Sequence, residues 1–85
     1  MLFRRRQKEK EPEILTISDE YIKLGQALKL AGMVGSGVDA KMLIQNEEVF
    51  VNGKVETRRG RKLYEGDIFT YEGESFRIAA QQTEA

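Results

Sequence analysis

The sequence contains no cysteine, no histidine and no long apolar run. Without cysteine there is no disulfide, thiolate nucleophile or thiolate metal site, and the lack of a recognisable secretion signal favours a cytoplasmic protein. Without histidine, the commonest general base and the commonest metal ligand at neutral pH are missing. No stretch approaches the roughly 18 apolar residues that span a bilayer. These absences argue against an enzyme, a metal site, a cofactor and a membrane partner.

The 85 residues leave room for one small domain and a short appendage. Residues 1–13 are too charged and too poor in apolar side chains to pack, so we expect a mobile arm there. This arm is either a plain solvated tail or an electrostatic arm that contacts a polyanion. Residues 14–80 form the predicted domain, and residues 81–85 form a predicted disordered tail.

The sequence has 14 basic and 14 acidic residues, so its formal net charge is zero, but the two kinds are unevenly distributed along the chain. Between Lys23 and Lys62 there are eight basic and four acidic residues, whereas from Leu63 to the end one base faces five acids. A fold that keeps these segments apart would present one cationic and one anionic region. This polarity predicts a charged partner.

Apolar periodicity predicts two helices early in the domain. The first has a stripe with helical spacing, made of Leu24, Ala27, Leu28 and Ala31. Gly32 can end this helix, while its start is left open between a cap at Ser18 and the beginning of the pattern near Ile22. The second helix is shorter, with a stripe of Ala40, Leu43 and Ile44. Gly35-Ser36-Gly37 before it is either an interhelix turn or a small anion site.

The pattern changes to strands in the second half of the domain. Val49–Val51, the turn signal Asn52-Gly53 and Val55 predict a hairpin. Further strands are expected at residues 14–17, 68–71 and 76–78, with turns at 64–67 and 72–75. Four aromatic residues are expected to pack in the core or on a sheet face rather than to stack on bases, and Tyr64, next to the basic run, is left open between these two roles: the four are Phe50, Phe69, Tyr71 and Phe76. Helices followed by strands indicate the α+β class.

The residues from Arg58 to Lys62, which we call the basic run, place four cations in five positions. Arginine makes bidentate contacts to phosphate, and each neutralised phosphate releases counterions, so the basic run predicts salt-dependent binding of a polyanion. Lys54 and Lys41 extend the cationic surface. The alternative is a solvated, extended linker whose charges only aid solubility.

Several segments in this order resemble the S4-like RNA-binding domain, and more closely its short, free-standing bacterial members: Ile22–Gly32, Ala40–Ile44, Val49–Val55, Thr57–Leu63 and Gly66-Asp67. The resemblance runs from about Ile22 to Ile78. It implies two packed helices on a small, curved, mostly antiparallel sheet, the alpha-L RNA-binding motif. It also implies binding of structured RNA without a catalytic domain.

The resemblance further implies which side chains bind RNA. They come from the start of the first helix, from the second helix, from the hairpin and from the basic run: Lys23, Gln26, Lys41, Gln45, Asn52, Lys54, Arg58, Arg59, Arg61 and Lys62. Ribosomal RNA or a ribosomal subunit is the expected partner, with transfer RNA as another possibility, in ribosome assembly or RNA quality control. A DNA-binding accessory protein and a protein-interaction adaptor remain as alternatives. We expect a monomer, because no long apolar face is left once the core is filled.

Overall fold

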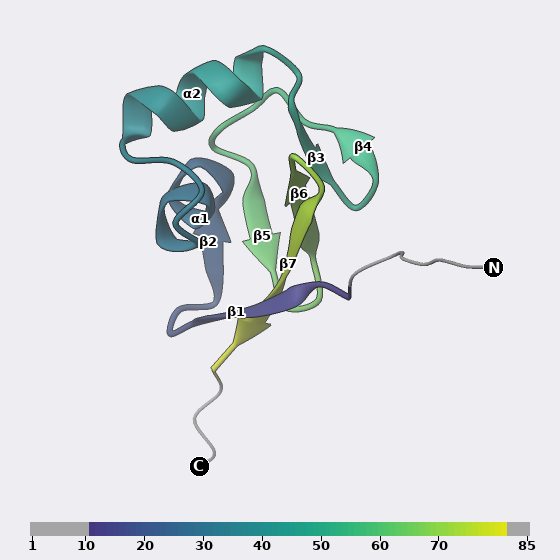
Figure 1. Ribbon diagram of the computed structural model, residues 1–85. Coiled ribbons are helices and arrows are strands. Elements are labelled where there is room, and N and C mark those ends of the chain that lie inside the picture. Colours follow the sequence, from purple (N-terminus) through teal and green to yellow (C-terminus); the bar gives the residue numbers. More distant parts are fainter. Residues whose placement is uncertain (1–10, 82–85) are drawn as a thin grey trace, which may run out of the picture.

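A computed structural model of the chain describes residues 11–81, and Figure 1 shows their arrangement. The described residues form two helices and seven strands: β1 (Glu13–Ile17), β2 (Tyr21–Lys23), α1 (Leu24–Leu30), α2 (Gly37–Gln45), β3 (Val49–Val51), β4 (Lys54–Val55), β5 (Lys62–Tyr64), β6 (Ile68–Tyr71) and β7 (Glu74–Ala80). The α+β prediction is confirmed. Neither helix of this part of the chain is long and apolar enough to cross a membrane.

Five strands form the larger sheet, in the order β1-β7-β6-β3-β4. β1 runs parallel to β7, and the other neighbours are antiparallel, so the sheet is mostly antiparallel as predicted. The parallel pair places Glu13 opposite Phe76. The domain strands therefore begin one residue inside the predicted arm of residues 1–13, because Glu13 completes the ladder with β7. Most of that arm, residues 1–10, and most of the predicted tail, residues 82–85, lie outside the described residues.

A second sheet has only two strands, β2 and β5, which pair antiparallel. Neither strand was expected, and Tyr64 was assigned to a turn although it is the last residue of β5. Each strand has three residues, too few for an alternating pattern to stand out from its surroundings. The pairing joins residues about forty positions apart, which no local signal reports.

The start of α1 corrects both predicted alternatives. β2 occupies residues 21–23, so Ser18 does not cap the helix and Ile22 lies in the strand. Lys23 is the extended N-cap residue, without a side-chain hydrogen bond to the helix. At the other end Gly32 adopts φ 78°, and the N–H of Met33 donates to the carbonyl oxygen of Leu28 at 3.0 Å. The predicted glycine stop is confirmed.

α2 begins earlier than its apolar stripe. Ser36 is the N-cap, and its hydroxyl accepts a hydrogen bond from the N–H of Asp39 at 3.2 Å. Gly37, predicted in the turn, is the first helical residue. The serine hydroxyl is used as a cap and the carboxylate of Asp39 lies in the first turn, so the segment Gly35-Ser36-Gly37 serves as the predicted interhelix turn.

Two tight hairpins bring the strands of the larger sheet together. Asn52 and Gly53 have φ of 52° and 86°, as a type I′ turn requires, which confirms the predicted hairpin between β3 and β4. Glu72 and Gly73 have φ of 54° and 79° in the same kind of turn between β6 and β7. That turn is shorter than predicted, because Glu74 and Ser75 already pair within β7.

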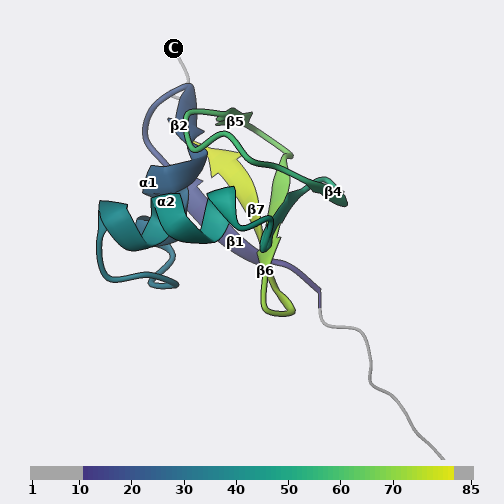
Figure 2. The same ribbon diagram turned by 90° about the horizontal axis from the view of Figure 1, so that it is seen from above.

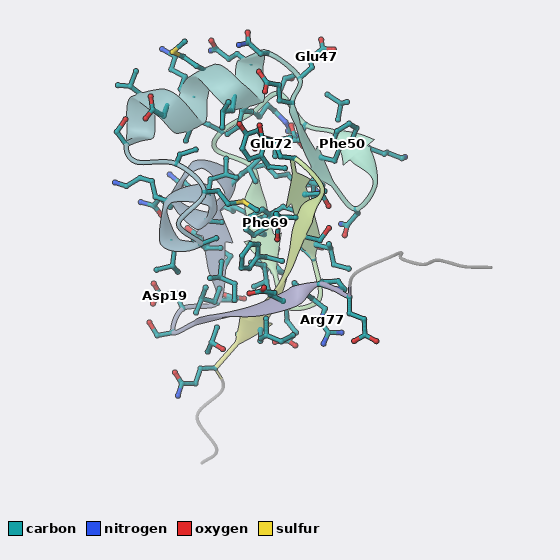
Figure 3. The ribbon with its side chains drawn as sticks, in the orientation of Figure 1. Asp19, Glu47, Phe50, Phe69, Glu72 and Arg77 are labelled. Atoms are coloured by element: carbon teal, nitrogen blue, oxygen red, sulfur yellow. The ribbon has the colours of Figure 1, made fainter. Side chains whose placement is uncertain are left out.

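The core lies between the helices and the inner faces of both sheets (Figure 3). Phe69 is fully buried at its centre and stacks on Phe76 with ring centroids 5.6 Å apart. The other fully buried large residues come from the helices and both sheets: Leu24, Leu28, Ile44, Val49, Leu63 and Ile78. Phe50 differs from these aromatics, since it lies on the outer face of the larger sheet, opposite Val55.

Candidate nucleic-acid interface

The basic run is anchored to the N-terminus of α1 by its backbone. The N–H of Leu24 donates to the carbonyl oxygen of Arg61 at 2.8 Å, and the N–H of Gly25 donates to that of Arg59 at 3.0 Å. These two bonds satisfy helix donors that no side chain caps. A Cβ placed on Gly25 would lie 3.5 Å from the Cβ of Arg59, which shows how closely the two segments approach. The basic run is therefore a docked loop and not an extended linker.

A buried carboxylate organises the same loop. Glu56 is only 7% exposed, and its carboxylate accepts hydrogen bonds from Arg58 Nε at 3.0 Å, from the Arg58 backbone N–H at 3.0 Å and from Arg61 Nη1 at 2.8 Å. The hydrogen bonds from Arg58, followed by the one from Arg61, lower the pKa of Glu56 to about 2, although burial opposes them. The same pairing raises the pKa of Arg58. Sequence analysis did not identify Glu56; its only sequence signal is an acid two residues before the four cations of the basic run.

The four cations of the basic run have different surroundings. The side chain of Arg58 is 72% exposed despite its ion pair, whereas that of Arg61 is 33% exposed. Within residues 11–81, the guanidinium of Arg59 has no ion pair and is exposed. Lys62 is exposed on β5, where its Nζ lies 4.7 Å from the ring centroid of Tyr21. Arg58, Arg59 and Lys62 can therefore reach a ligand, while Arg61 mainly supports the loop.

One shallow hollow gathers residues from three separate segments. It lies at the N-terminal side of α1 and is lined by Lys23, Gly25, Gln26, Lys29, Gly37 and Arg59. Three of the ten predicted site residues, Lys23, Gln26 and Arg59, thus share one concave, cationic surface. Within that lining the only charges are positive, so the hollow suits an anion such as phosphate.

The remaining predicted residues lie outside this hollow. Lys41 and Gln45 are exposed one turn apart on α2. Lys54 is exposed on β4, which Figure 2 shows at the right-hand edge of the molecule, away from β2 and α1. The side chain of Asn52 is engaged within the protein: its Nδ2 donates to Asp67 at 3.1 Å, and its Oδ1 accepts from the N–H of Ile68 at 3.0 Å.

The outer face of the two-stranded sheet is a feature that sequence analysis missed. Its register places Tyr21 opposite Tyr64 and Lys23 opposite Lys62, all on one face. Ile22 and Leu63 point the other way, into the core. The sequence signal was the matched order Tyr-Ile-Lys and Lys-Leu-Tyr, which becomes meaningful only once the strands are paired.

Acidic side chains collect in two places. Asp19, Glu20 and Glu65 lie around Tyr64, at the end of the two-stranded sheet away from the basic run. Burial is the main cause that raises the pKa of Tyr71, and the nearby carboxylates of Glu72 and Glu48 raise it further. Along the two-stranded sheet the charge therefore changes from Lys23 and Lys62 at one end to carboxylates at the other, of which only Glu65 belongs to the acidic segment after Leu63.

A cationic loop docked on a short helix and a small, mostly antiparallel sheet is the arrangement of a small nucleic-acid-binding type of domain. The chain belongs to the S4 domain family, whose model matches residues 15–79. The predicted family and the alpha-L architecture are confirmed.

Two relatives cover most of the domain. The chain is 49% identical over 59 residues to Probable ribosome maturation protein RlbA of Bacillus subtilis (strain 168), a match that covers 69% of this chain and 83% of that protein. It is 37% identical over 60 residues to YbcJ of Escherichia coli (strain K12), covering 71% and 86%. The solution structure of YbcJ, described as revealing an alpha-L motif involved in RNA-binding, superposes with a TM-score of 0.64 at 28% identity, over 91% of this chain and 99% of that one.

Proposed function

We propose that this chain is a cytoplasmic, non-catalytic binder of structured RNA that acts in ribosome assembly or RNA quality control. Its first expected target is ribosomal RNA or a ribosomal subunit, and transfer RNA is the second. Membership of the S4 domain family supports this proposal. So do the ribosome maturation role in the name of the B. subtilis relative and the RNA-binding motif described for the E. coli structure.

The observation that carries the proposal is the docking of the basic run on α1. Because the carbonyl oxygens of Arg59 and Arg61 cap the helix, the backbone of the loop is held against α1, and Arg59 lies beside Lys23 and Gln26. A pre-arranged set of cations loses less conformational entropy on binding than a flexible tail does. Proteins recognise double-helical RNA mostly by its shape and by contacts to its backbone, which a docked cationic surface can supply.

The proposed contacts divide by position. Direct phosphate contacts come from the exposed cations around α1 and the basic run, with Gln26 as a hydrogen-bonding neighbour: Lys23, Arg58, Arg59 and Lys62. Lys41 and Gln45 extend the surface along α2, and Lys54 extends it to the hairpin. Arg61 and Asn52 contribute by holding the loop and the hairpin in shape, since their side chains are already bonded to Glu56 and Asp67.

The experiment compares two arginine variants at matched salt. R59A removes one exposed cation of the hollow, and R77A removes an exposed arginine on the outer face of the larger sheet. Binding of ribosomal RNA, transfer RNA and duplex DNA is measured over a salt series. We expect R59A to weaken RNA binding and to reduce the log–log salt slope by about 1, whereas R77A leaves both unchanged.

Other outcomes would redirect the proposal. Equal affinity for duplex DNA would favour a DNA-binding accessory protein. Absence of nucleic-acid binding, or equal effects of R59A and R77A, would contradict the proposed surface and favour a protein-interaction adaptor. Sedimentation of the free protein tests the expected monomer.

A further inference from the structure

The outer face of the two-stranded sheet consists of two tyrosines and two lysines. The register places Tyr21 beside Tyr64 at one end of the sheet, and Lys23 beside Lys62 at the end that joins the basic run. No other side chain of β2 or β5 shares this face, because Ile22 and Leu63 pack in the core. Exposed aromatic residues on a sheet, with cations next to them, form the surface on which proteins stack unpaired bases.

The two rings are not equivalent. Tyr21 is covered on one side by the Lys62 ammonium, 4.7 Å from its centroid, and it also contacts Tyr64 at a centroid distance of 5.7 Å with 48° between the ring planes. Tyr64 is 43% exposed. Tyr21 and Lys62 therefore brace the pair, and Tyr64 offers the open ring.

Charge sets the direction in which a nucleotide can lie on this face. Phosphate is attracted to Lys23 and Lys62, which continue into Arg59 and the hollow beside α1. Beyond Tyr64 the neighbours are Asp19, Glu20 and Glu65, which repel phosphate. A base can stack on Tyr64 while its phosphate stays over the lysines, but a longer strand cannot continue past that ring.

We propose that the outer face of the two-stranded sheet binds one unpaired RNA nucleotide next to a structured region, with its base stacked on Tyr64 and its phosphate at Lys62 and Lys23. This site deepens the proposed function and rests on it, because the structured region occupies the surface around α1. It assigns Tyr21 and Tyr64 to RNA recognition. The acidic border limits the gain in affinity to the first unpaired nucleotide.

The test uses a blunt RNA hairpin and the same hairpin carrying a short tail of unpaired adenosines at either end. We expect the wild-type protein to bind one tailed hairpin more tightly than the blunt one. Y64L should weaken the tailed complex about five-fold or more, in keeping with the cost of removing one stacked base, and leave the blunt complex unchanged. Y64F should retain the preference, because the ring is kept.

The matched control is F50L, which removes an exposed aromatic ring from the outer face of the larger sheet, 38% exposed in the native protein. We expect F50L to bind both hairpins as the wild type does. A second measurement needs no variant: 2-aminopurine placed as the first tail nucleotide should lose fluorescence on binding if its base stacks on the protein. Lengthening the tail beyond two nucleotides should add little affinity.

The outcomes separate the two proposals. If RNA binds but tailed and blunt hairpins bind alike, or if Y64L and F50L weaken the tailed complex equally, the stacking site is wrong and the proposed function stands. An unchanged 2-aminopurine signal in the bound complex would also overturn the stacking site. If no RNA of any kind binds, the proposed function fails and the stacking site fails with it.

Discussion

The two sheets differ in what they present to solvent. The outer face of the larger sheet carries a nearly neutral mixture with one cation, Arg77, flanked in register by Ile14 and Ile68. The outer face of the two-stranded sheet carries only tyrosine and lysine. In Figure 3 Arg77 and Phe50 lie on the side of the larger sheet that faces away from the helices.

The larger sheet supplies most of the core, since four of its five strands contribute buried apolar residues. The smaller sheet contributes only Leu63 among the fully buried large side chains, yet its strands lead directly into α1 and out of the basic run. The smaller sheet therefore positions the charged side chains, while the larger sheet stabilises the domain. Four predictions test this division, in order of decreasing effect.

The largest effect is expected from removing the core contact of the smaller sheet. Leu63 is fully buried, so L63A should lower the free energy of unfolding by about 2–5 kcal/mol. I78A, at an equally buried position of the larger sheet, should cost a similar amount. RNA affinity, measured where both variants are folded, should fall for L63A and stay near wild type for I78A. Equal RNA affinities would contradict the division of roles.

Glu56 gives a stability contribution that depends on pH. Its folded pKa of about 2 lies below the ordinary 4.5, so the stabilisation is complete above about pH 5 and is lost as pH falls toward 2. The size of the shift sets an upper bound of about 3 kcal/mol. E56Q should therefore be about 1–3 kcal/mol less stable at pH 7 and should lose less stability on acidification than the wild type. Chemical denaturation at a series of pH values measures the free energy of unfolding of both proteins. If the wild type and E56Q lose the same stability between about pH 5 and about pH 2, Glu56 does not have this role.

The side chain of Asn52 stabilises the larger sheet through polar contacts, and its replacement tests this contribution. Its side chain bonds to Asp67 and to the N–H of Ile68, and its backbone adopts φ 52°. N52A should cost about 1–2 kcal/mol through lost hydrogen bonds and a strained turn, and N52G should cost less because glycine tolerates this conformation. RNA affinity should change less than two-fold in both. A larger loss of affinity in folded N52G would assign the Asn52 side chain to RNA contact.

The smallest effect is expected at Arg77. R77A should change the free energy of unfolding by less than about 0.5 kcal/mol, because this side chain is exposed and forms no ion pair within residues 11–81. Thermal denaturation beside the wild type measures the change. A substantial loss of stability would show that the outer face of the larger sheet contributes to stability through Arg77, contrary to this prediction.

Local patterns were sufficient for several elements. The helical stripe from Leu24 to Ala31, the Gly32 stop and the Asn52-Gly53 turn each depend on residues close together in the chain, and each was predicted correctly. Spacing and backbone conformation are local properties, so a short window of sequence contains the information. The same holds for the basic run, whose charge is visible without any structure.

The sequence by itself therefore determined the class of the fold, the family and the presence of a cationic segment. Only the tertiary structure decided where those cations stand. The pairing of β2 with β5, the capping of α1 by the carbonyl oxygens of Arg59 and Arg61, and the burial of Glu56 all join segments distant in the chain. Buried hydrogen-bond donors and charges need partners, and these partners come from any segment that the fold brings close. Which segments are brought close depends on the whole fold and not on the local sequence.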